Sequence, residues 1–459
     1  MRVRRPPDTA DRGYRWKETA VNLEQLRKRA KERLREERRA DPEIKLSDVQ
    51  LAIAREHGFA SWPRMKAYVD RLAEHPDGLQ FAYHTDLGYY EDRAYGLRAS
   101  ADDGTAPALA AFEHGDAPLT QGGARLVLAR AHGFPSWQAL RRHVGRLPGS
   151  GEPFFRAYRA IEAHDPDGLG EVLDRWPEVA ALEGTNGNDL LAMATSTRDE
   201  RTVQLLLDRG ADPSHANAHG WTALHQAAYV NAVDLAQRLL RAGGRAHLSA
   251  RGDGGTPLIV ALFCGYRKVT EVLAPAGMHP RNLRTAAGLG DLSLVNELAG
   301  SRQAGAHRGF YRPHSGFPAW TPSEDPQEIL DEALAYGARN GRVRVLAALV
   351  DHGARLEADV YRGTPLIWAA SRGRSAAVTR LLSLGADPIG RGSFGGESHG
   401  KQVTPLHLAG ASGDARTVKI LLDAGADPSV VDGHGYGTPA SWARHGGHDD
   451  VAALIERRA

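Results

Sequence analysis

Apolar residues recur along most of the chain at three- and four-residue spacing, in segments long enough for only two or three helical turns. The clearest case lies between residues 404 and 425, where two such segments share one apolar seam. This seam is formed by Leu406, Ala409, Val418, Leu421 and Leu422. Gly425 can adopt the left-handed conformation that ends a helix. The pattern predicts pairs of short helices that bury their apolar faces only against neighbouring pairs.

A longer helix is predicted from Leu23 to Ala40, because its apolar residues follow the helical period. Residues 1–45 carry 15 Lys/Arg and 9 Asp/Glu, and we expect residues 1–22 to form a basic tail. The basic residues of the helix stand among Glu32, Glu36 and Glu37. Two interpretations remain open: a solvated helix face, or an arm that contacts nucleic acid or an acidic partner.

Two segments of the N-terminal part are related to each other. Residues 48–72 and 123–147 share 11 of 25 identities, including a His-Gly-Phe triplet and a Ser-Trp pair. The glycine is suited to end one helix and the serine to cap the next. Each copy therefore predicts a helix-turn-helix-like unit, and the two units predict a helical domain over residues 23–150.

A stronger repeat begins near residue 154. Thr-Pro-Leu occurs at 256–258, 364–366 and 404–406, with altered copies at 222–224 and 438–440. Gly-Ala-Asp-Pro follows a helical segment at 210–213, 385–388 and 425–428. Intervals of 34 residues separate Thr222 from Thr256 and Thr404 from Thr438. In each copy the threonine is suited to cap a helix whose first turn the proline fixes.

This pattern resembles the ankyrin repeat, whose unit of about 33 residues contains a turn and two helices. The resemblance covers residues 154–459 and implies an all-α fold, an ankyrin-repeat solenoid of about eight units behind a small helical domain, as in some bacterial ankyrin proteins. An insertion at 301–326 and a widened finger at 389–402 interrupt the repeats. The resemblance also implies that His225 and His407 tie adjacent turns by hydrogen bonds rather than bind a metal.

The concave face of such a stack is lined by positions late in the first helix of each repeat. Alignment on Gly413 places there Gln226, Tyr229, Phe263, Tyr336, Arg339, Asn340, Trp368, Ser371, Arg372, Trp442 and His445. Aromatic and arginine side chains are typical of protein interfaces, so we expect a partner-binding surface. The expected anchors are Tyr229, Tyr336, Trp368 and Trp442, and Arg339 and Arg372 would pair with acidic groups. Alternatively, neighbouring fingers cover some of these rings, or the alignment slips by one residue.

The insertion at 301–326 is rich in aromatic residues, histidines and prolines. Its candidate binding residues are His307, Tyr311, Arg312, His314 and Trp320. Long loops without secondary structure are usually functional or disordered, and the aromatic content argues against disorder. Three interpretations stay open: a lid over the concave face, a direct contact with a partner, or a packed loop. No metal is expected there, because no ligand spacing supports one.

Composition excludes several other classes of protein. The 58 Lys+Arg and 56 Asp+Glu residues nearly balance, and the hydrophobic share of 42% argues against global disorder. No stretch approaches about 18 apolar residues and no signal-peptide pattern follows the N-terminus, so we expect no membrane partner and a cytoplasmic location. The single cysteine, Cys264, cannot form an internal disulfide, and we interpret it as a packed thiol.

The sequence contains no nucleophile motif, phosphate loop or Cys/His cluster. We therefore predict no catalytic residues, no metal and no cofactor. The expected function is non-catalytic recognition of a protein or peptide through the concave face and the fingers. Two alternatives remain: an enzyme or small-molecule binder whose pocket the 301–326 insertion closes, and nucleic-acid binding by the basic N-terminal helical domain.

Overall fold

The structure is a computed structural model. It describes residues 23–56 except 40 and 43, residues 62, 63 and 66, 84–145 except 103 and 133, 153–250, 255–301 except 278, 325–359, 363–392, 402–433 and 437–458. The regular elements of these residues are helices, with two isolated antiparallel bridges that join Glu183 to Asp189 and Gly392 to Val403. The all-α fold class is confirmed. The tail at 1–22 and residues 302–324 of the insertion lie outside the described residues.

The N-terminal part contains two groups of helices. Helices α1 (Leu23–Glu37) and α2 (Leu46–Glu56) pack around Leu26 and Ile53. Helices α4 (Leu87–Asp102), α5 (Ala106–His114), α6 (Gln121–Ala131) and α7 (Trp137–Val144) enclose a separate core. Within the second related segment, α6 and α7 form the expected helix, turn and helix, and the Ser136 hydroxyl accepts the Ala139 amide at 3.3 Å. Most of residues 57–83 lie outside the described residues, so the duplication stays a prediction.

From residue 153 onward, the described residues form nine successive helix pairs, against about eight expected. The pairs are α8 (Pro153–Glu162) with α9 (Pro166–Arg175), α10 (Leu190–Thr197) with α11 (Glu200–Asp208), α12 (Ala223–Tyr229) with α13 (Val233–Arg241), α14 (Pro257–Cys264) with α15 (Arg267–Leu273), α16 (Leu283–Leu289) with α17 (Leu292–Ser301), α18 (Pro326–Arg339) with α19 (Val343–Asp351), α20 (Pro365–Ser371) with α21 (Ser375–Ser383), α22 (Pro405–Ser412) with α23 (Ala415–Asp423), and α24 (Pro439–His445) with α25 (Asp449–Glu456). Short 3-10 helices lie at η3 (Pro177–Ala181), η4 (Thr185–Gly187) and η5 (Ala274–Ala276). One continuous apolar core runs through the stack. None of the described helices is both long and apolar enough to cross a bilayer.

Histidines in the Thr-x-Leu-His position join each repeat to the next. The Nδ1 atom of His407 accepts the Thr404 amide at 3.2 Å, so its Nε2 atom carries the proton and donates to the Gly437 carbonyl at 3.0 Å. His225 makes the same contacts with Thr222 and with Gly255 of the following turn. Both rings are fully buried. These hydrogen bonds satisfy the buried amides of the threonines, and they give the carbonyls of Gly255 and Gly437 a second donor besides a backbone amide.

We expect His407→Ala to lower the free energy of unfolding by about 2 kcal/mol, because the Thr404 amide and the Gly437 carbonyl lose a buried partner. Burial also lowers the pKa of His407 below its ordinary value, so the folded state favours the neutral ring. This stabilisation is complete above the unfolded pKa of about 6.5 and is lost as the pH falls from there toward the folded pKa. Urea unfolding at pH 7.5 and pH 5.5 should therefore show a smaller difference between wild type and variant at pH 5.5. An equal loss of unfolding free energy at the two pH values would contradict this prediction. So would a loss for His247→Ala, on an exposed turn, as large as that for His407→Ala.

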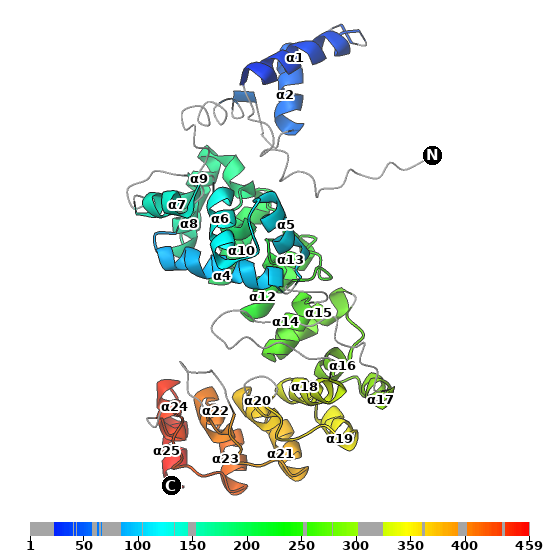
Figure 1. The fold of residues 1–459 in the computed structure, drawn as a ribbon, viewed down its shortest axis with the longest axis vertical. Coiled ribbons are helices and arrows are strands. Elements are labelled where there is room, and N and C mark those ends of the chain that lie inside the picture. Colours follow the sequence, from blue (N-terminus) through cyan, green and yellow to red (C-terminus); the bar gives the residue numbers. More distant parts are fainter. Residues whose placement is uncertain are drawn as a thin grey trace.

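The direction of stacking changes at the α16–α17 pair. In Figure 1, α8–α15 stack from top to bottom, whereas α18–α25 stack from right to left. Only residues 277–282 connect η5 to α16. The corresponding connections between the other repeats, which form the fingers, are longer. Helix α14 consequently packs against both α16 and α18. The stack has a corner here, at which the C-terminal ends of α14, α18 and α20 meet.

Candidate partner-binding surface

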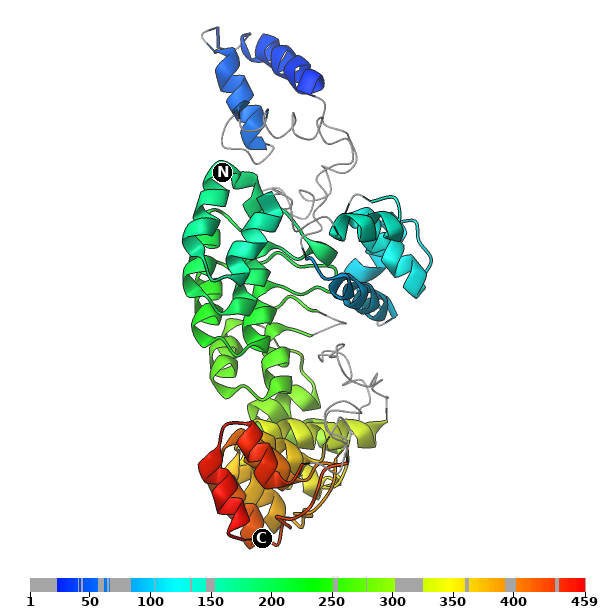
Figure 2. The same cartoon turned by 90° about the vertical axis from the view of Figure 1, so that its left-hand side faces the viewer.

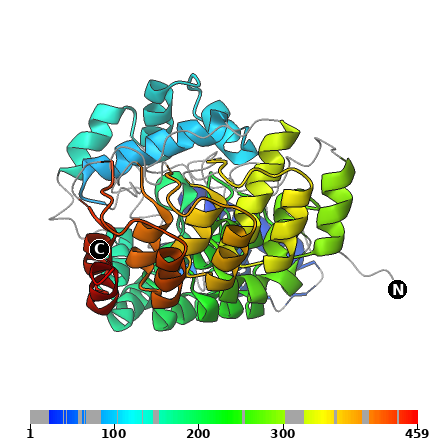
Figure 3. The ribbon, with the colours of Figure 1, turned by 90° about the horizontal axis from the view of Figure 1, so that it is seen from below.

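Helices α4–α7 lie on the side of the stack to which the finger loops project (Figures 2 and 3). Both α4 and α6 contact η4, in the finger before α10. The Asn186 side chain donates to the Arg93 carbonyl at 3.0 Å, His219 hydrogen-bonds Ser100 at 2.8 Å, and His132 hydrogen-bonds Thr185 at 3.1 Å. Both histidines are buried. The α4–α7 unit therefore covers the first two fingers and withdraws them from any partner.

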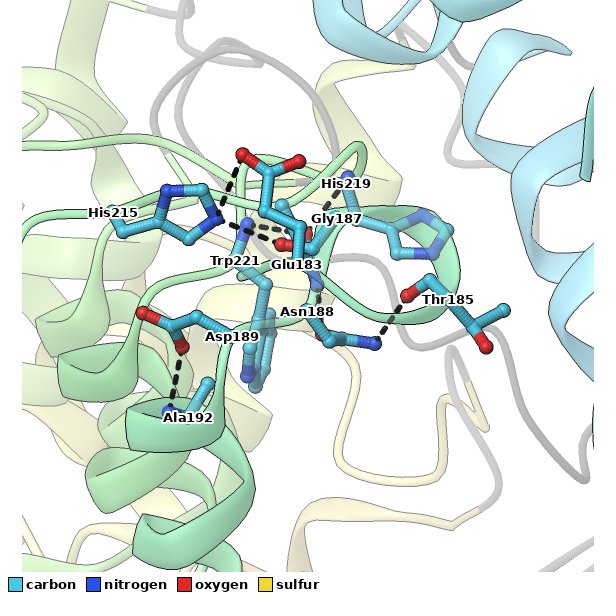
Figure 4. Close-up of polar contacts among 10 residues, drawn as sticks. Glu183, Thr185, Gly187, Asn188, Asp189, Ala192, His215, His219 and Trp221 are labelled. Atoms are coloured by element: carbon cyan, nitrogen blue, oxygen red, sulfur yellow. Dashed lines mark hydrogen bonds and ion pairs between the residues drawn. The ribbon is translucent and has the colours of Figure 1, made fainter. Parts of the chain in front are cut away.

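The covered fingers are held together by an amide network (Figure 4). The Asn217 side chain donates to Asn188 Oδ1 at 2.7 Å, and its oxygen accepts the amides of His219 and Trp221. Asn188 in turn donates to the Thr185 carbonyl at 2.9 Å. Because each amide side chain binds backbone groups of a finger, the network fixes the surface on which α4–α7 rest.

Three titratable groups stand beside this network (Figure 4). Asp189 caps α10 by accepting the Ala192 amide at 2.8 Å, and burial raises its pKa to about 6. His215 Nε2 donates to the Gly187 carbonyl at 2.7 Å and lies 3.9 Å from Glu183 Oε1. Burial opposes a charge on His215, but the neighbouring carboxylates raise its pKa above the ordinary value. Asp189 binds the backbone of α10 and His215 binds the backbone of a finger, so the role of these two side chains is structural.

We expect His219→Ala to loosen α4–α7 from the fingers, because it removes the hydrogen bond to Ser100 from a buried contact. Losing a buried hydrogen bond costs about 1–3 kcal/mol, so amide exchange in α4 should accelerate about tenfold or more. Hydrogen exchange followed by mass spectrometry measures this, with His247→Ala on an exposed turn as the control. Unchanged exchange in α4 would show that His219 does not hold the unit in place.

Five of the residues expected on the concave face are instead buried. Phe263, Tyr336, Arg339, Asn340 and Trp368 are each no more than 7% exposed. They lie at the corner, where the inner helices approach one another too closely to leave an open face. The prediction that these five residues bind a partner is therefore wrong, and the alternative that neighbouring elements cover the rings holds for them.

Arg339 is the centre of this buried corner cluster. Its guanidinium carbon lies 3.9 Å from the ring centre of Trp368, 4.9 Å from that of Tyr336 and 5.0 Å from that of Phe263. It donates to the Phe263 carbonyl at 2.7 Å and to the Ala335 carbonyl at 3.2 Å. The side chain of Asn340 donates to the Leu262 carbonyl at 2.8 Å. These contacts fasten α18 directly to α14.

Burial changes the acidity of the groups in the corner. It lowers the pKa of Arg339 to about 10, so the guanidinium stays charged at neutral pH. It raises the pKa of Cys264 to about 11, which leaves the thiol protonated, as a packed cysteine should be. Burial likewise raises the pKa values of Tyr336 and Glu332. Glu332 forms a buried ion pair with Arg284 of α16, which ties the middle repeat to the same cluster.

The other six predicted residues keep exposed surface. Tyr229 is 44% exposed at the end of α12, and His445 is exposed at the end of α24. Gln226, Ser371, Arg372 and Trp442 are half-buried. Of these, Gln226 accepts the Trp221 indole N–H and Trp442 donates to Asp432, so both also position finger residues. His307, Tyr311, Arg312, His314 and Trp320 lie outside the described residues.

Sequence reasoning missed two further groups on this side of the stack. Ile389 and Val431, in the fingers after α21 and α23, are 52% and 42% exposed. Arg342 and Arg374 precede the second helices of their repeats and lie beside Arg372 at the corner. Each of the two arginines follows a glycine with positive φ, and this Gly-Arg pair was a signal in the sequence.

Two observations on the described residues bear on metal and nucleic-acid binding. No three His, Cys, Asp or Glu side chains among them come close enough to share a metal ion. On α1, Lys28 pairs with Glu32 at 4.0 Å and Arg33 with Glu37 at 2.7 Å. The basic face of α1 is thus partly neutralised by its own carboxylates.

Comparison with known proteins concerns the repeats. A family model described as "Ankyrin repeats (3 copies)" matches residues 183–282 and 283–391, and one described as "Ankyrin repeat" matches 401–433, together more than half of the chain. The chain is 23% identical over 353 residues to the human Transient receptor potential cation channel subfamily A member 1, covering 60% of this chain and 31% of that protein. It is 26% identical over 276 residues to mouse Rabankyrin-5, covering 53% and 23%, and 35% identical over 88 residues to Protein PhlB of Serratia liquefaciens, covering 19% and 39%. This chain spans less than a third of the length of the first two relatives. It belongs to the ankyrin repeat proteins.

Proposed function

We propose that this chain is a non-catalytic scaffold that binds a protein or peptide through the concave face and fingers of its repeats. The carrying observation is the set of large apolar side chains left exposed on that side: Tyr229, Ile389 and Val431. Exposed aromatic and aliphatic groups on a rigid framework are typical of binding surfaces. The repeats supply that framework, since each repeat between the first and the last is packed against two neighbours.

The proposed surface is narrower than the sequence implied. The first two fingers are covered by α4–α7, and the corner buries five of the expected binding residues, two of them expected anchors. The part of the surface that stays accessible includes Tyr229 at the end of α12 and Arg372 at the corner. It also includes the fingers and the first-helix ends of the last three repeats, where Trp442 and His445 lie. We place the partner along this surface.

A nuclease-treated pull-down from the source lysate tests the proposal. Wild type is compared with a Tyr229→Ser/His445→Ser variant, in which only exposed concave positions change. The matched control, Arg344→Gln/Lys419→Gln, alters the second helices α19 and α23 instead. A protein that is retained by wild type and control but lost from the concave variant is the expected result. Identical retention by all three baits, or by none, would contradict the proposal.

A further inference from the structure

Four arginines from three repeats gather at the edge of the corner. Arg267 begins α15, Arg342 and Arg374 precede α19 and α21, and Arg372 follows α20. Their stems lie against left-handed glycines of preceding repeats. A Cβ atom at Gly290 would lie 3.0 Å from Arg342 Cδ, one at Gly341 3.2 Å from Arg374 Cδ, and one at Gly265 3.3 Å from Arg372 Cγ. Glycine thus allows the arginine stems to pack closely and fixes where their charged ends emerge.

The hydrogen bonds of these arginines go mainly to backbone carbonyls. Arg374 donates to Gly265 at 2.7 Å and to Arg339 at 3.1 Å, and Arg342 donates to Gly288 at 2.9 Å. Arg372 stacks on the Tyr266 ring, with 4.9 Å between its guanidinium carbon and the ring centre. Among the described residues, the one carboxylate paired with any of the four is Glu271, at 2.9 Å from Arg267. Carbonyls hold the guanidinium groups in place without neutralising them.

The four positive charges repel one another. Burial lowers the pKa of Arg374, and the charges of Arg372, Arg267 and Arg342 lower it further. Burial and Arg267 also lower the pKa of Arg342, and the carboxylate of Glu271 opposes them in part. An anion placed among these groups would relieve the repulsion, and guanidinium groups bind carboxylates by paired, charge-assisted hydrogen bonds. Both the geometry and the charge therefore favour an anionic ligand.

Two aspartates limit the length of the cluster. Asp291 follows Gly290 at the start of α17, and Asp414 lies beside Gly373 at the start of α23. Asp414 is held by the hydroxyls of Ser375 and Thr417. These negative charges would repel the evenly spaced phosphates of a nucleic acid that extended beyond the arginines. A short acidic stretch in a protein fits the space between them.

We propose that Arg267, Arg342, Arg372 and Arg374 bind an acidic segment of the partner protein, a short run of aspartates or glutamates. This inference rests on the proposed scaffold function and specifies the chemistry of its ligand. In this proposal the exposed Tyr229 and the half-buried Trp442 supply apolar contacts to the partner, while the arginine cluster supplies the charged contact.

Fluorescence polarisation with the full chain tests this. The probe is a labelled decapeptide of alternating glutamate and glycine, and its controls are the same peptide with glutamine and a single-stranded DNA of ten nucleotides. Of the three probes, we expect only the glutamate peptide to bind. Its affinity should be lower at 200 mM than at 50 mM NaCl. Arg372→Gln should weaken binding about tenfold, the fold-change of one charge-assisted contact, and Arg344→Gln on α19 should not. Arg267→Gln, at a mostly exposed side chain, provides a second variant that leaves the packing intact.

Three results would overturn the inference: no binding of the glutamate peptide, equal affinities for Arg372→Gln, Arg267→Gln and Arg344→Gln, or stronger binding of the DNA. The scaffold proposal can fail separately. If a protein is captured in a Tyr229-dependent manner while the glutamate peptide does not bind, the scaffold function stands and the acidic-segment inference falls. If the lysate yields no concave-dependent partner, the scaffold proposal itself falls.

Discussion

Arg339→Ala is expected to lower the free energy of unfolding by about 4 kcal/mol. The substitution removes a side chain that is 1% exposed and leaves the Phe263 carbonyl without its guanidinium donor, whereas the Ala335 carbonyl keeps its backbone donor within α18. Each unsatisfied buried carbonyl costs about 1–3 kcal/mol, and a cavity in the core adds to this. The rings of Tyr336 and Trp368 also lose the cation that lies between them. Urea unfolding followed by circular dichroism measures the effect.

Arg339→Met separates the contributions of charge and volume. Methionine fills most of the space and removes the desolvation cost of a buried charge. We therefore expect Arg339→Met to lose less unfolding free energy than Arg339→Ala. Arg344→Ala, on the neighbouring helix α19 and exposed, should change the unfolding free energy by less than about 0.5 kcal/mol. A loss below about 1 kcal/mol for Arg339→Ala would show that the corner does not depend on this residue.

Gly265→Ala is expected to lower the free energy of unfolding by about 3 kcal/mol or more. Gly265 has a φ of 70°, and a Cβ atom there would lie 2.8 Å from the carbonyl oxygen of Arg339. That carbonyl is held in place by Arg374, at 3.1 Å, and cannot easily move away. The variant would therefore combine left-handed strain with a clash at the point where the two arms of the stack meet.

Gly425→Ala is the matched control for this substitution. Gly425 also has a positive φ, 92°, but a Cβ atom there would meet open space. It should cost only the left-handed strain of about 1–2 kcal/mol. The difference between the two variants in thermal or urea unfolding isolates the close approach at the corner. Equal losses would mean that α14 and α18 are not in contact as the structure has them.

The repeats were predictable because each obeys local rules. Threonine caps, prolines in the first turn and glycines at the helix ends recur at a fixed spacing, and the structure places helices at those positions. The roles of His225 and His407 were implied by the resemblance to ankyrin repeats, and their hydrogen bonds to the following turns agree with it. Such features depend on residues within one repeat and its neighbour, which the sequence brings together.

The concave surface was only partly predictable, because it depends on how the stack bends. Position-by-position alignment assumes that all repeats follow one curve. The stacking direction changes at the α16–α17 pair, after a short connection, and Tyr336, Arg339 and Trp368 are buried at the resulting corner. Their aromatic and arginine composition was interpreted as that of a partner-binding surface. In the structure these side chains instead join helices α14, α18 and α20 of this chain.

The covering of the first fingers could not be inferred from the sequence either. Its contacts join residues more than 50 positions apart: Arg93 with Asn186, Ser100 with His219, and His132 with Thr185. Only His132 belongs to a motif that the sequence shows, the repeated His-Gly-Phe triplet, and that motif does not indicate its partner. The arginine cluster is similar, since its members come from three repeats and are brought together only by the corner.

The central claim, that a partner lies on the accessible concave face, is tested most directly by site-specific photocrosslinking in the source lysate. A photoreactive phenylalanine is placed at Tyr229 or His445 on the concave side, and at Arg344 or Lys419 on the second helices as controls. We expect one protein to be crosslinked from both concave positions and from neither control position. Crosslinks that form only from Arg344 or Lys419, or none from either concave position, would contradict it.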